Sequence, residues 1–308
     1  MRVIGTPSPG YRSGFVGLIG RPNVGKSTIM NHLVGQKVSI TSPVSQTTRN
    51  QLLGIITTHR SQIIFVDTPG IHKPHHQLGK ILVASARAAI SRVDLVLFVV
   101  DGSTIAGRGD QFIADLLHRS QTPVILGINK IDLRSTNIEP NQAIEQSYQS
   151  LSNCSDWPKY QFSALTPSGL DLLHAGIEAH LPNGPYYYPP EMVTDQPERF
   201  IMGELIREQI LLLTRQEIPH SVAITIDRVE AAPKLTKILA TIHVERQTQK
   251  MIVIGKRGEM LKAIGSAARQ QIQKLISGKV YLELFVKVQP KWRQSQEQLS
   301  ALGYTVAQ

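Results

Sequence analysis

The sequence of 308 residues lacks most of what secreted and membrane-spanning proteins need. Its single cysteine, Cys154, excludes an intramolecular disulfide and fits a reducing compartment. No apolar run reaches the ~18 residues of a transmembrane helix. Pro7, Pro9 and Gly10 stand where a signal peptide would have its apolar region. We therefore expect a cytoplasmic protein with a flexible leader over residues 1–13.

The charge is unevenly distributed along the chain. Residues 1–197 contain 16 basic and 13 acidic residues, whereas residues 198–308 contain 17 and 10. Hydrophobic residues make up 41% of the sequence and charged residues 18%, which is ordinary for a globular protein with room for two cores. The basic second part favours a polyanionic partner, although charge alone is equally typical of a solvated surface.

A phosphate-binding motif, G-x-x-x-x-G-K-[ST], begins at Gly20. An apolar strand-like run, 15–19, precedes it and a helical run, 28–34, follows, so unpaired N–H groups at a helix start face the anion. We expect Lys26 to reach the β- and γ-phosphates and Ser27 to ligate Mg²⁺. The predicted phosphate-binding residues are Gly20, Arg21, Pro22, Asn23, Val24, Gly25, Lys26, Ser27 and Thr28.

Two later motifs predict the base. Asn129, Lys130 and Asp132 form N-K-x-D after the apolar run 124–128. A carboxylate there accepts from the N1–H and amino group of guanine, a donor pair that adenine lacks. Asn129 would connect this loop to the phosphate loop, and the stem of Lys130 would cover one face of the base. A short S-A-L string, weak by itself, would offer backbone N–H groups to the guanine oxygen; it comprises Ser163, Ala164 and Leu165.

A D-T-P-G turn completes the nucleotide site at Asp67, Thr68, Pro69 and Gly70. Asp67 would hold Mg²⁺ through water, and the Gly70 N–H would contact the γ-phosphate. Upstream, Thr48 is the favoured further Mg²⁺ ligand, with Thr47 the alternative. Elsewhere such a tetrapeptide is most often an ordinary turn.

Residues 182–199 predict a domain boundary, because five prolines between 182 and 197 favour an extended connection. Its three tyrosines, 186–188, either stack on RNA or, as we favour, pack onto a domain. Beyond it the order is α-β-β-α-β. The predicted elements are a helix over 204–214, strands over 222–229 and 237–246, a helix-rich segment over 259–276 and a strand over 280–288.

A G-x-x-G loop, Gly255 to Gly258, lies between these elements and resembles the loop with which KH domains clamp single-stranded RNA. A glycine-capped turn is the alternative. Trp292 would stack on a base or anchor the tail. The predicted RNA-binding residues are Ile254, Gly255, Lys256, Arg257, Gly258, Lys262, Lys291 and Arg293.

Together these motifs make residues 15–181 similar to a translation-factor-class GTPase domain, and nearly the whole chain resembles the Era family. The resemblance implies an α/β P-loop GTPase domain with a mostly parallel sheet over 14–181, a linker over 182–199 and an α+β type II KH domain over 200–308. It also implies GTP hydrolysis, binding of single-stranded RNA near the 3′ end of 16S ribosomal RNA and a role in 30S subunit assembly. Peripheral association with anionic membranes is a further implication, and no DNA is expected.

One absence bears on the chemistry. Ile71 follows the D-T-P-G turn, where many GTPases have the glutamine that orients the attacking water. The expected catalytic residues are Lys26, Thr48, Gly70 and Asn23, and by resemblance Asn23 would ligate an activating K⁺. Neighbouring histidines predict a solvated loop rather than a metal site: His72, His75 and His76.

A second hypothesis has a GTPase switch that acts on a protein partner or a membrane process, with a protein-binding second domain. The basic loop from Gly255 to Gly258 favours RNA over this alternative. A single phosphate-binding motif occurs, which excludes tandem relatives with two GTPase domains.

Overall fold

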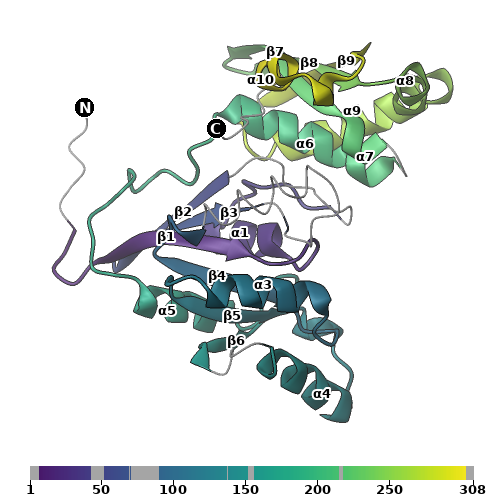
Figure 1. Ribbon diagram of the computed structural model, residues 1–308. Coiled ribbons are helices and arrows are strands. Elements are labelled where there is room, and N and C mark those ends of the chain that lie inside the picture. The colour runs from purple at the N-terminus through teal and green to yellow at the C-terminus, as the bar shows by residue number, and fades with distance from the viewer. Residues whose placement is uncertain are drawn as a thin grey trace. The chain divides into compact units, whose positions relative to one another are not determined.

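The computed structural model describes residues 7–42, 52–68, 70, 90–136, 138–151, 156–214 and 218–302, which form two compact units (Figure 1). The first comprises residues 1–39 and 45–195, and the second residues 40–44 and 196–308. None of the helices in these ranges is long and apolar enough to span a bilayer.

The first unit has a six-stranded sheet in the order β2-β3-β1-β4-β5-β6. Every neighbouring pair is parallel except β2 and β3, so the predicted mostly parallel α/β class is confirmed. The strands are β1 (Arg12–Ile19), β2 (Leu52–Thr57), β3 (Ser61–Asp67), β4 (Leu95–Asp101), β5 (Val124–Asn129) and β6 (Lys159–Gln161).

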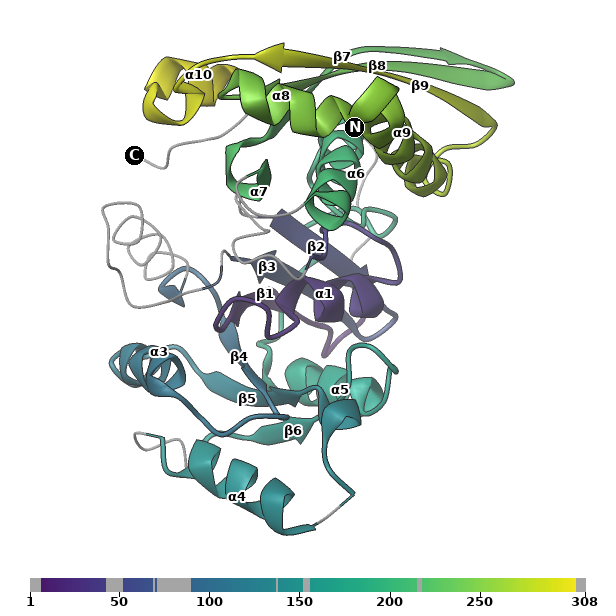
Figure 2. The same cartoon turned by 90° about the vertical axis from the view of Figure 1, so that its right-hand side faces the viewer.

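Helices cover both faces of this sheet (Figure 2), which is why β3 and β5 are buried throughout and mainly apolar. α3 and α4 share one core with β4 and β5, and α1 and α5 lie on the opposite face. β1 lies between β3 and β4, so the order of the sheet reverses there and the strand ends around β1 form a crevice for a ligand. The helices are α1 (Lys26–Val34), α3 (Arg108–His118), α4 (Ile138–Gln149) and α5 (Leu170–His180), with a 3₁₀ turn, η1 (Ile131–Leu133).

Both ends of the first unit depart from the predicted boundaries. The expected leader over 1–13 is too long, because Tyr11 is buried and β1 already begins at Arg12. Two tyrosines of the proline-rich segment pack onto the same unit. The ring of Tyr186 packs at a tilt against that of Tyr11, with centroids 4.8 Å apart, and the ring centroid of Tyr187 lies 5.3 Å from that of Phe15. These contacts favour the packing role of the tyrosines over RNA stacking.

The second unit has a three-stranded sheet with helices on one face, which confirms the predicted α+β class (Figure 2). β7 and β8 are antiparallel, and β8 and β9 are parallel, with two helices between them. The elements are α6 (Glu198–Leu213), α7 (Ile218–Ser221), β7 (Ala223–Ala232), β8 (Leu235–Val244), α8 (Gln247–Ile254), η3 (Lys256–Gly258), α9 (Glu259–Ile272), β9 (Lys279–Val288), η4 (Trp292–Gln294) and α10 (Gln296–Ala301).

Two helices of this unit differ from the prediction. α6 begins at Glu198 rather than at residue 204, because Pro197 caps it and an acidic residue in the first turn complements the helix dipole. α8 had no predicted counterpart: Met251 and Ile252 are exposed on it, which obscures an amphipathic pattern.

Candidate nucleotide and nucleic-acid sites

The phosphate loop joins β1 to the first turn of α1. Gly25 has φ 101°, and a Cβ on it would lie 2.2 Å from the Asn129 amide nitrogen, so only glycine fits. Asn23 also has a positive φ, 64°, which asparagine tolerates, and it is exposed. The predicted strand–loop–helix context is therefore present. The loop remains a predicted phosphate site.

Lys26 is nearly buried within this loop and its Nζ donates to two loop carbonyls, those of Gly20 at 3.2 Å and Arg21 at 3.0 Å. Burial lowers the pKa of Lys26 to about 8, although the nearby Asp67 carboxylate opposes the shift. An anion placed at the loop would restore the preference for the charged form. The position of Lys26 therefore suits a lysine that binds phosphate.

Ser27 and Asp67 meet at the ends of α1 and β3. The Ser27 hydroxyl donates to Asp67 Oδ2 at 2.8 Å, and the Ser39 hydroxyl donates to the same oxygen at 3.1 Å. Asp67 is fully buried. A carboxylate beside hydroxyl oxygens is the hard donor set that Mg²⁺ prefers, so these residues fit the predicted metal.

The Asn129 side chain connects its own loop to the phosphate loop, as predicted, and also to the S-A-L loop. Its Nδ2 donates to the Val24 carbonyl of the phosphate loop at 2.8 Å, and its Oδ1 accepts from the Ala164 N–H at 2.9 Å. Asn129 is buried. It therefore fixes the base loop and the S-A-L loop against the phosphate loop without help from a ligand.

Asp132 is held by the S-A-L loop. Ser163 donates its hydroxyl to Asp132 Oδ1 at 2.5 Å and accepts from the N–H groups of Leu165 and Thr166. The S-A-L N–H groups, expected to face a guanine oxygen, thus have partners within the protein: the Ala164 N–H bonds to Asn129. The S-A-L loop orients the Asp132 carboxylate through a side chain, which sequence reasoning did not anticipate.

Two carboxylates missed by sequence reasoning support the nucleotide motifs. Asp101, at the end of β4, accepts from Lys130 Nζ at 2.7 Å and from Ser103. Burial raises its pKa, but the hydrogen bonds from Lys130 and Ser103 outweigh burial and leave the pKa below its usual value. Asp110, fully buried on α3, pairs with Arg21 of the phosphate loop at 2.8 Å. Asp101 could have been found, because it ends a buried strand beside Asn129.

Of the remaining residues of the D-T-P-G turn, the structure describes Thr68 and Gly70. Thr68 donates its hydroxyl to the Leu18 carbonyl, and Gly70 lies against Pro22. Several predictions fall outside the described residues: those on Cys154, Thr47, Thr48, Pro69, Ile71, His72, His75 and His76.

The G-x-x-G loop separates α8 from α9. Gly255 has φ 74° and ψ 177°, and Gly258 has φ 81°, both of which favour glycine. Lys256 and Arg257 are exposed, with Arg257 at a positive φ of 52°. The loop therefore presents bare backbone and two cations outward.

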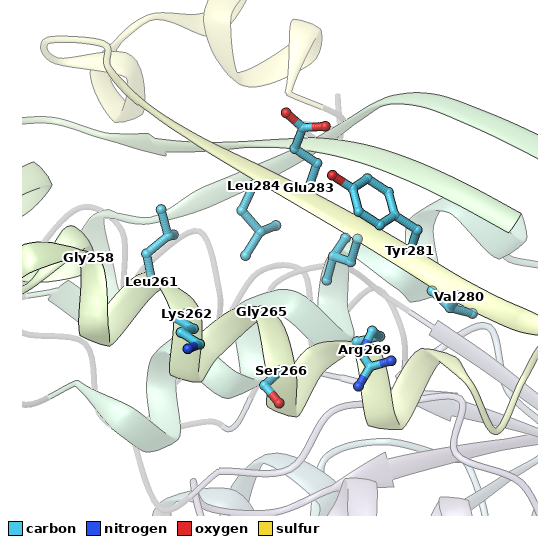
Figure 3. A pocket seen from close by; sticks show the side chains of 11 residues that line it. Gly258, Leu261, Lys262, Gly265, Ser266, Arg269, Val280, Tyr281, Glu283 and Leu284 are labelled. Atoms are coloured by element: carbon cyan, nitrogen blue, oxygen red, sulfur yellow. The ribbon is translucent and has the colours of Figure 1, made fainter.

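A groove of about 630 Å³ runs from this loop between α9 and β9 (Figure 3). Lys262, a predicted residue, lies in it, whereas Ser266 and Arg269 were missed although they follow at helical spacing. The lining residues are Gly258, Leu261, Lys262, Gly265, Ser266, Arg269, Val280, Tyr281, Leu282, Glu283 and Leu284.

The basic residues near the C-terminus lie outside this groove. Lys291 is exposed, and Arg293 forms an ion pair with Glu245 at 2.5 Å. Trp292 is buried, and its indole N–H donates to the Ser221 carbonyl at 3.2 Å. The structure therefore supports an anchoring role for Trp292 and not a stacking role.

Comparison with known families agrees with this architecture. Residues 15–130 match the family described as 50S ribosome-binding GTPase, and residues 217–293 match the KH domain. The chain is 67% identical to the GTPase Era of Nostoc sp. over 97% of its length and 91% of that protein. It is 65% identical to the GTPase Era of Rippkaea orientalis over 96% of its length and 94% of that protein.

Two solved structures are similar over nearly the whole chain. One is Era in complex with MgGDPNP and nucleotides 1506–1542 of 16S ribosomal RNA, with a TM-score of 0.88, 37% identity, and coverage of 96% of this chain and 99% of that one. The other is a variant of Aquifex aeolicus Era bound to GDP·AlF₄⁻, with a TM-score of 0.88, 36% identity and the same coverage.

Proposed function

The chain belongs to the Era family of GTPases, and on that premise we propose that it hydrolyses GTP and binds single-stranded RNA near the 3′ end of 16S ribosomal RNA during 30S subunit assembly. The observation that carries the proposal is that one chain holds both an oriented guanine-reading carboxylate and a G-x-x-G loop beside a basic groove. A similar protein has been solved with both ligands bound.

Guanine specificity is assigned to Asp132. Its carboxylate faces two donors on the base edge, N1–H and the amino group, and Ser163 holds it in place. Lys130 is fixed by Asp101, so its stem is positioned to cover the base. Adenine would leave the carboxylate without its two donors, which costs affinity.

The phosphates are assigned to the loop N–H groups, Lys26 and the Gly70 N–H. Ser27 and Asp67 would hold Mg²⁺, directly and through water, and Thr48 would complete the shell. When bound, the ion neutralises charge on the β- and γ-phosphates. Lys26, charged once phosphate is present, stabilises the charge that develops between the β- and γ-phosphates as the bond breaks.

We assign a second cation, K⁺, to Asn23. Ile71 cannot orient water, so this chain needs another source of charge stabilisation. Asn23 is exposed on the phosphate loop in a left-handed conformation. An amide oxygen is a suitable ligand for K⁺, a hard cation.

RNA is assigned to the groove between α9 and β9. Single-stranded backbone would pass over Gly255–Gly258, where the absence of side chains allows close approach. Lys256, Arg257 and Lys262 are exposed and would meet phosphates, and Arg269 extends this line of charge. Lys291 would add a distal phosphate contact, whereas Arg293 would first have to leave Glu245.

Continuity of the chain would allow the bound nucleotide to control RNA binding. Residues 40–44 belong to the second unit, although the chain continues from them directly to Thr47 and Thr48. The Thr41 N–H donates to the buried Glu208 carboxylate of α6 at 2.8 Å. A metal contact at Thr48 would therefore bias a segment that is anchored in the RNA-binding unit.

The proposed function assigns one domain to the nucleotide and one to RNA. We propose a GTPase domain over 14–181, with residues 11–13 and 182–195 packed onto it, and a KH domain that begins with α6. We also propose a cytoplasmic location with a peripheral fraction on anionic membranes, through the basic surface of the second unit.

Filter binding tests the proposal. Fragments from the 3′ end of 16S ribosomal RNA should bind at nanomolar to micromolar concentration at fixed salt, and GTP hydrolysis should be measurable in the same preparation. Absence of RNA binding by a protein that still hydrolyses GTP would favour the alternative in which the second domain binds a protein.

A further inference from the structure

We propose that the outer face of the β7–β9 sheet is a second RNA-contacting surface, on which Tyr281 and Phe285 stack bases of the strand that leaves the α9–β9 groove. The proposal rests on the proposed RNA-binding function of the groove. It extends the footprint from one side of β9 to the other.

β9 alternates strictly between two faces. One set of its side chains is apolar and packs against the core of the second unit: Val280, Leu282, Leu284, Val286 and Val288. The other set points away from that core: Lys279, Tyr281, Glu283, Phe285 and Lys287. Tyr281 and Phe285 each remain 50% exposed. Large rings left half in water on a basic edge strand have stacking surface available.

The neighbours of these rings are polar and mostly cationic. The β8–β9 register places Lys237 beside Tyr281 and Thr241 beside Phe285. Lys237, Lys279 and Lys287 are exposed. A protein-docking face would need a contiguous apolar patch, whereas aromatic rings flanked by lysines suit a phosphate backbone with unstacked bases.

The carboxylates on this face offset that charge only in part. Asp227 of β7 accepts from the hydroxyls of Thr225 and Thr241, at 3.1 and 2.7 Å. Glu230 pairs with Arg228 at 2.7 Å. Glu283 lies between the two rings, where it disfavours a phosphate and leaves base contacts to the aromatic side chains.

The surface is continuous with the groove. β9 is an edge strand of the sheet, and its residues 280–284 line the groove, so RNA has only this strand to cross. Figure 3 shows Leu284 directed toward α9, with Tyr281 and Glu283 directed away from it. The helices α6, α8 and α9 lie on the opposite face of the sheet (Figure 2). The two rings are four positions apart along the strand and therefore about 13 Å apart, which suits non-adjacent nucleotides.

Two lengths of RNA test the proposal with the full chain. Fluorescence anisotropy would compare labelled oligoribonucleotides of about 5 nucleotides, which fill a KH groove, and about 12 nucleotides from the 3′ end of 16S ribosomal RNA. The variant Phe285→Ser, which changes a ring that does not line the groove, should bind the short RNA like the parent protein. It should bind the long RNA about tenfold or more weakly.

Two controls separate stacking from structural damage. Phe285→Tyr keeps the ring and should retain full affinity for the long RNA. Leu212→Ser removes a side chain of equal exposure, 50%, on α6 and should change neither affinity.

Each result decides the proposal. Unchanged affinity of the serine variant for the long RNA, or an equal loss with both RNAs, would overturn it while leaving the groove function intact. Failure of the parent protein to bind either RNA would instead refute the groove function on which it rests.

Discussion

The two units prepare their sites in opposite ways. In the first, three polar side chains of the predicted nucleotide site are buried and already hydrogen-bonded: Lys26, Asp67 and Asn129 are each at most 7% exposed. In the second, the cations of the G-x-x-G loop, Lys256 and Arg257, stand exposed on the surface. A small ligand of fixed shape needs groups that are held in place, whereas a flexible polyanion can bind to exposed cations.

This difference predicts how each site responds to change. A buried group that loses its ligand or partner costs the full desolvation penalty, so single substitutions in the first unit should have large, salt-insensitive effects. Exposed cations contribute through counterion release, so affinity in the second unit should fall steeply with salt.

The largest expected effect comes from reversing the charge of the G-x-x-G loop. Lys256→Asp/Arg257→Asp should abolish RNA binding, because phosphate contacts are lost and repulsion is introduced where the backbone must approach closely. GTP affinity and basal hydrolysis should remain near those of the parent, and any stimulation of hydrolysis by RNA should disappear. Filter retention measures the loss of RNA binding, and phosphate release measures GTP hydrolysis with and without RNA.

Matched neutral changes sharpen this test. Lys256→Gln/Arg257→Gln removes charge without repulsion and should lower both the RNA affinity and the slope of its salt dependence. Undiminished RNA binding by the folded aspartate variant would remove the KH assignment and favour a protein partner.

The next largest effect concerns the base. Asp132→Asn should weaken GTP by about 2–5 kcal/mol and favour xanthosine triphosphate, because the donor–acceptor pairing at the purine edge is reversed. Isothermal titration with both nucleotides measures the exchange. Ser163→Ala should weaken GTP less, because it releases the carboxylate without changing its chemistry. Parental GTP affinity in Asp132→Asn would refute the assignment of the N-K-x-D loop.

Hydrolysis should also depend on the monovalent cation. The rate in K⁺ should exceed that in Na⁺ at equal ionic strength by about tenfold or more, and Asn23→Ala should erase the difference. Phosphate release in the two salts, with nucleotide affinity measured in parallel, gives the result. Equal rates in the parent protein would contradict the role of Asn23 and point to an activator supplied in trans.

The smallest effect is a pH dependence confined to the first unit. The pKa of Lys26 is lowered to about 8, and bound phosphates would raise it. Below pH 8 the lysine is charged with or without nucleotide, so this group leaves affinity unchanged. Above pH 8 binding must take up a proton, so GTP affinity should fall by up to about tenfold per pH unit. Titrations between pH 7 and 9.5 test this, and an affinity independent of pH over that range would contradict it.

Much of the fold could be predicted because its signals are local. The apolar strands before Asp67 and Asn129 place both residues at one edge of a parallel sheet, and the structure brings the two loops to the same crevice. In the second unit, period-two alternation gave three strands within a few residues of their observed bounds. The roles assigned to individual site residues remain predictions.

What escaped prediction depends on contacts between distant segments. Asp110 and Glu208 have no motif, and only the folded chain brings them to Arg21 and Thr41. The groove was half predicted, because Lys262 belongs to a motif while its β9 wall is defined only by sheet pairing. The end of the leader was misjudged because burial of Tyr11 arises from Tyr186, far along the chain.

The most direct test of the account is whether the ligand of one unit alters the affinity of the other. RNA affinity should be measured by anisotropy at one salt concentration, with the protein saturated by GDP or by a non-hydrolysable GTP analogue. The account predicts tighter RNA binding with the GTP analogue, and linkage requires that RNA then tighten the analogue relative to GDP by the same factor. Identical RNA affinity in the two nucleotide states would show that the units act independently and would contradict the account.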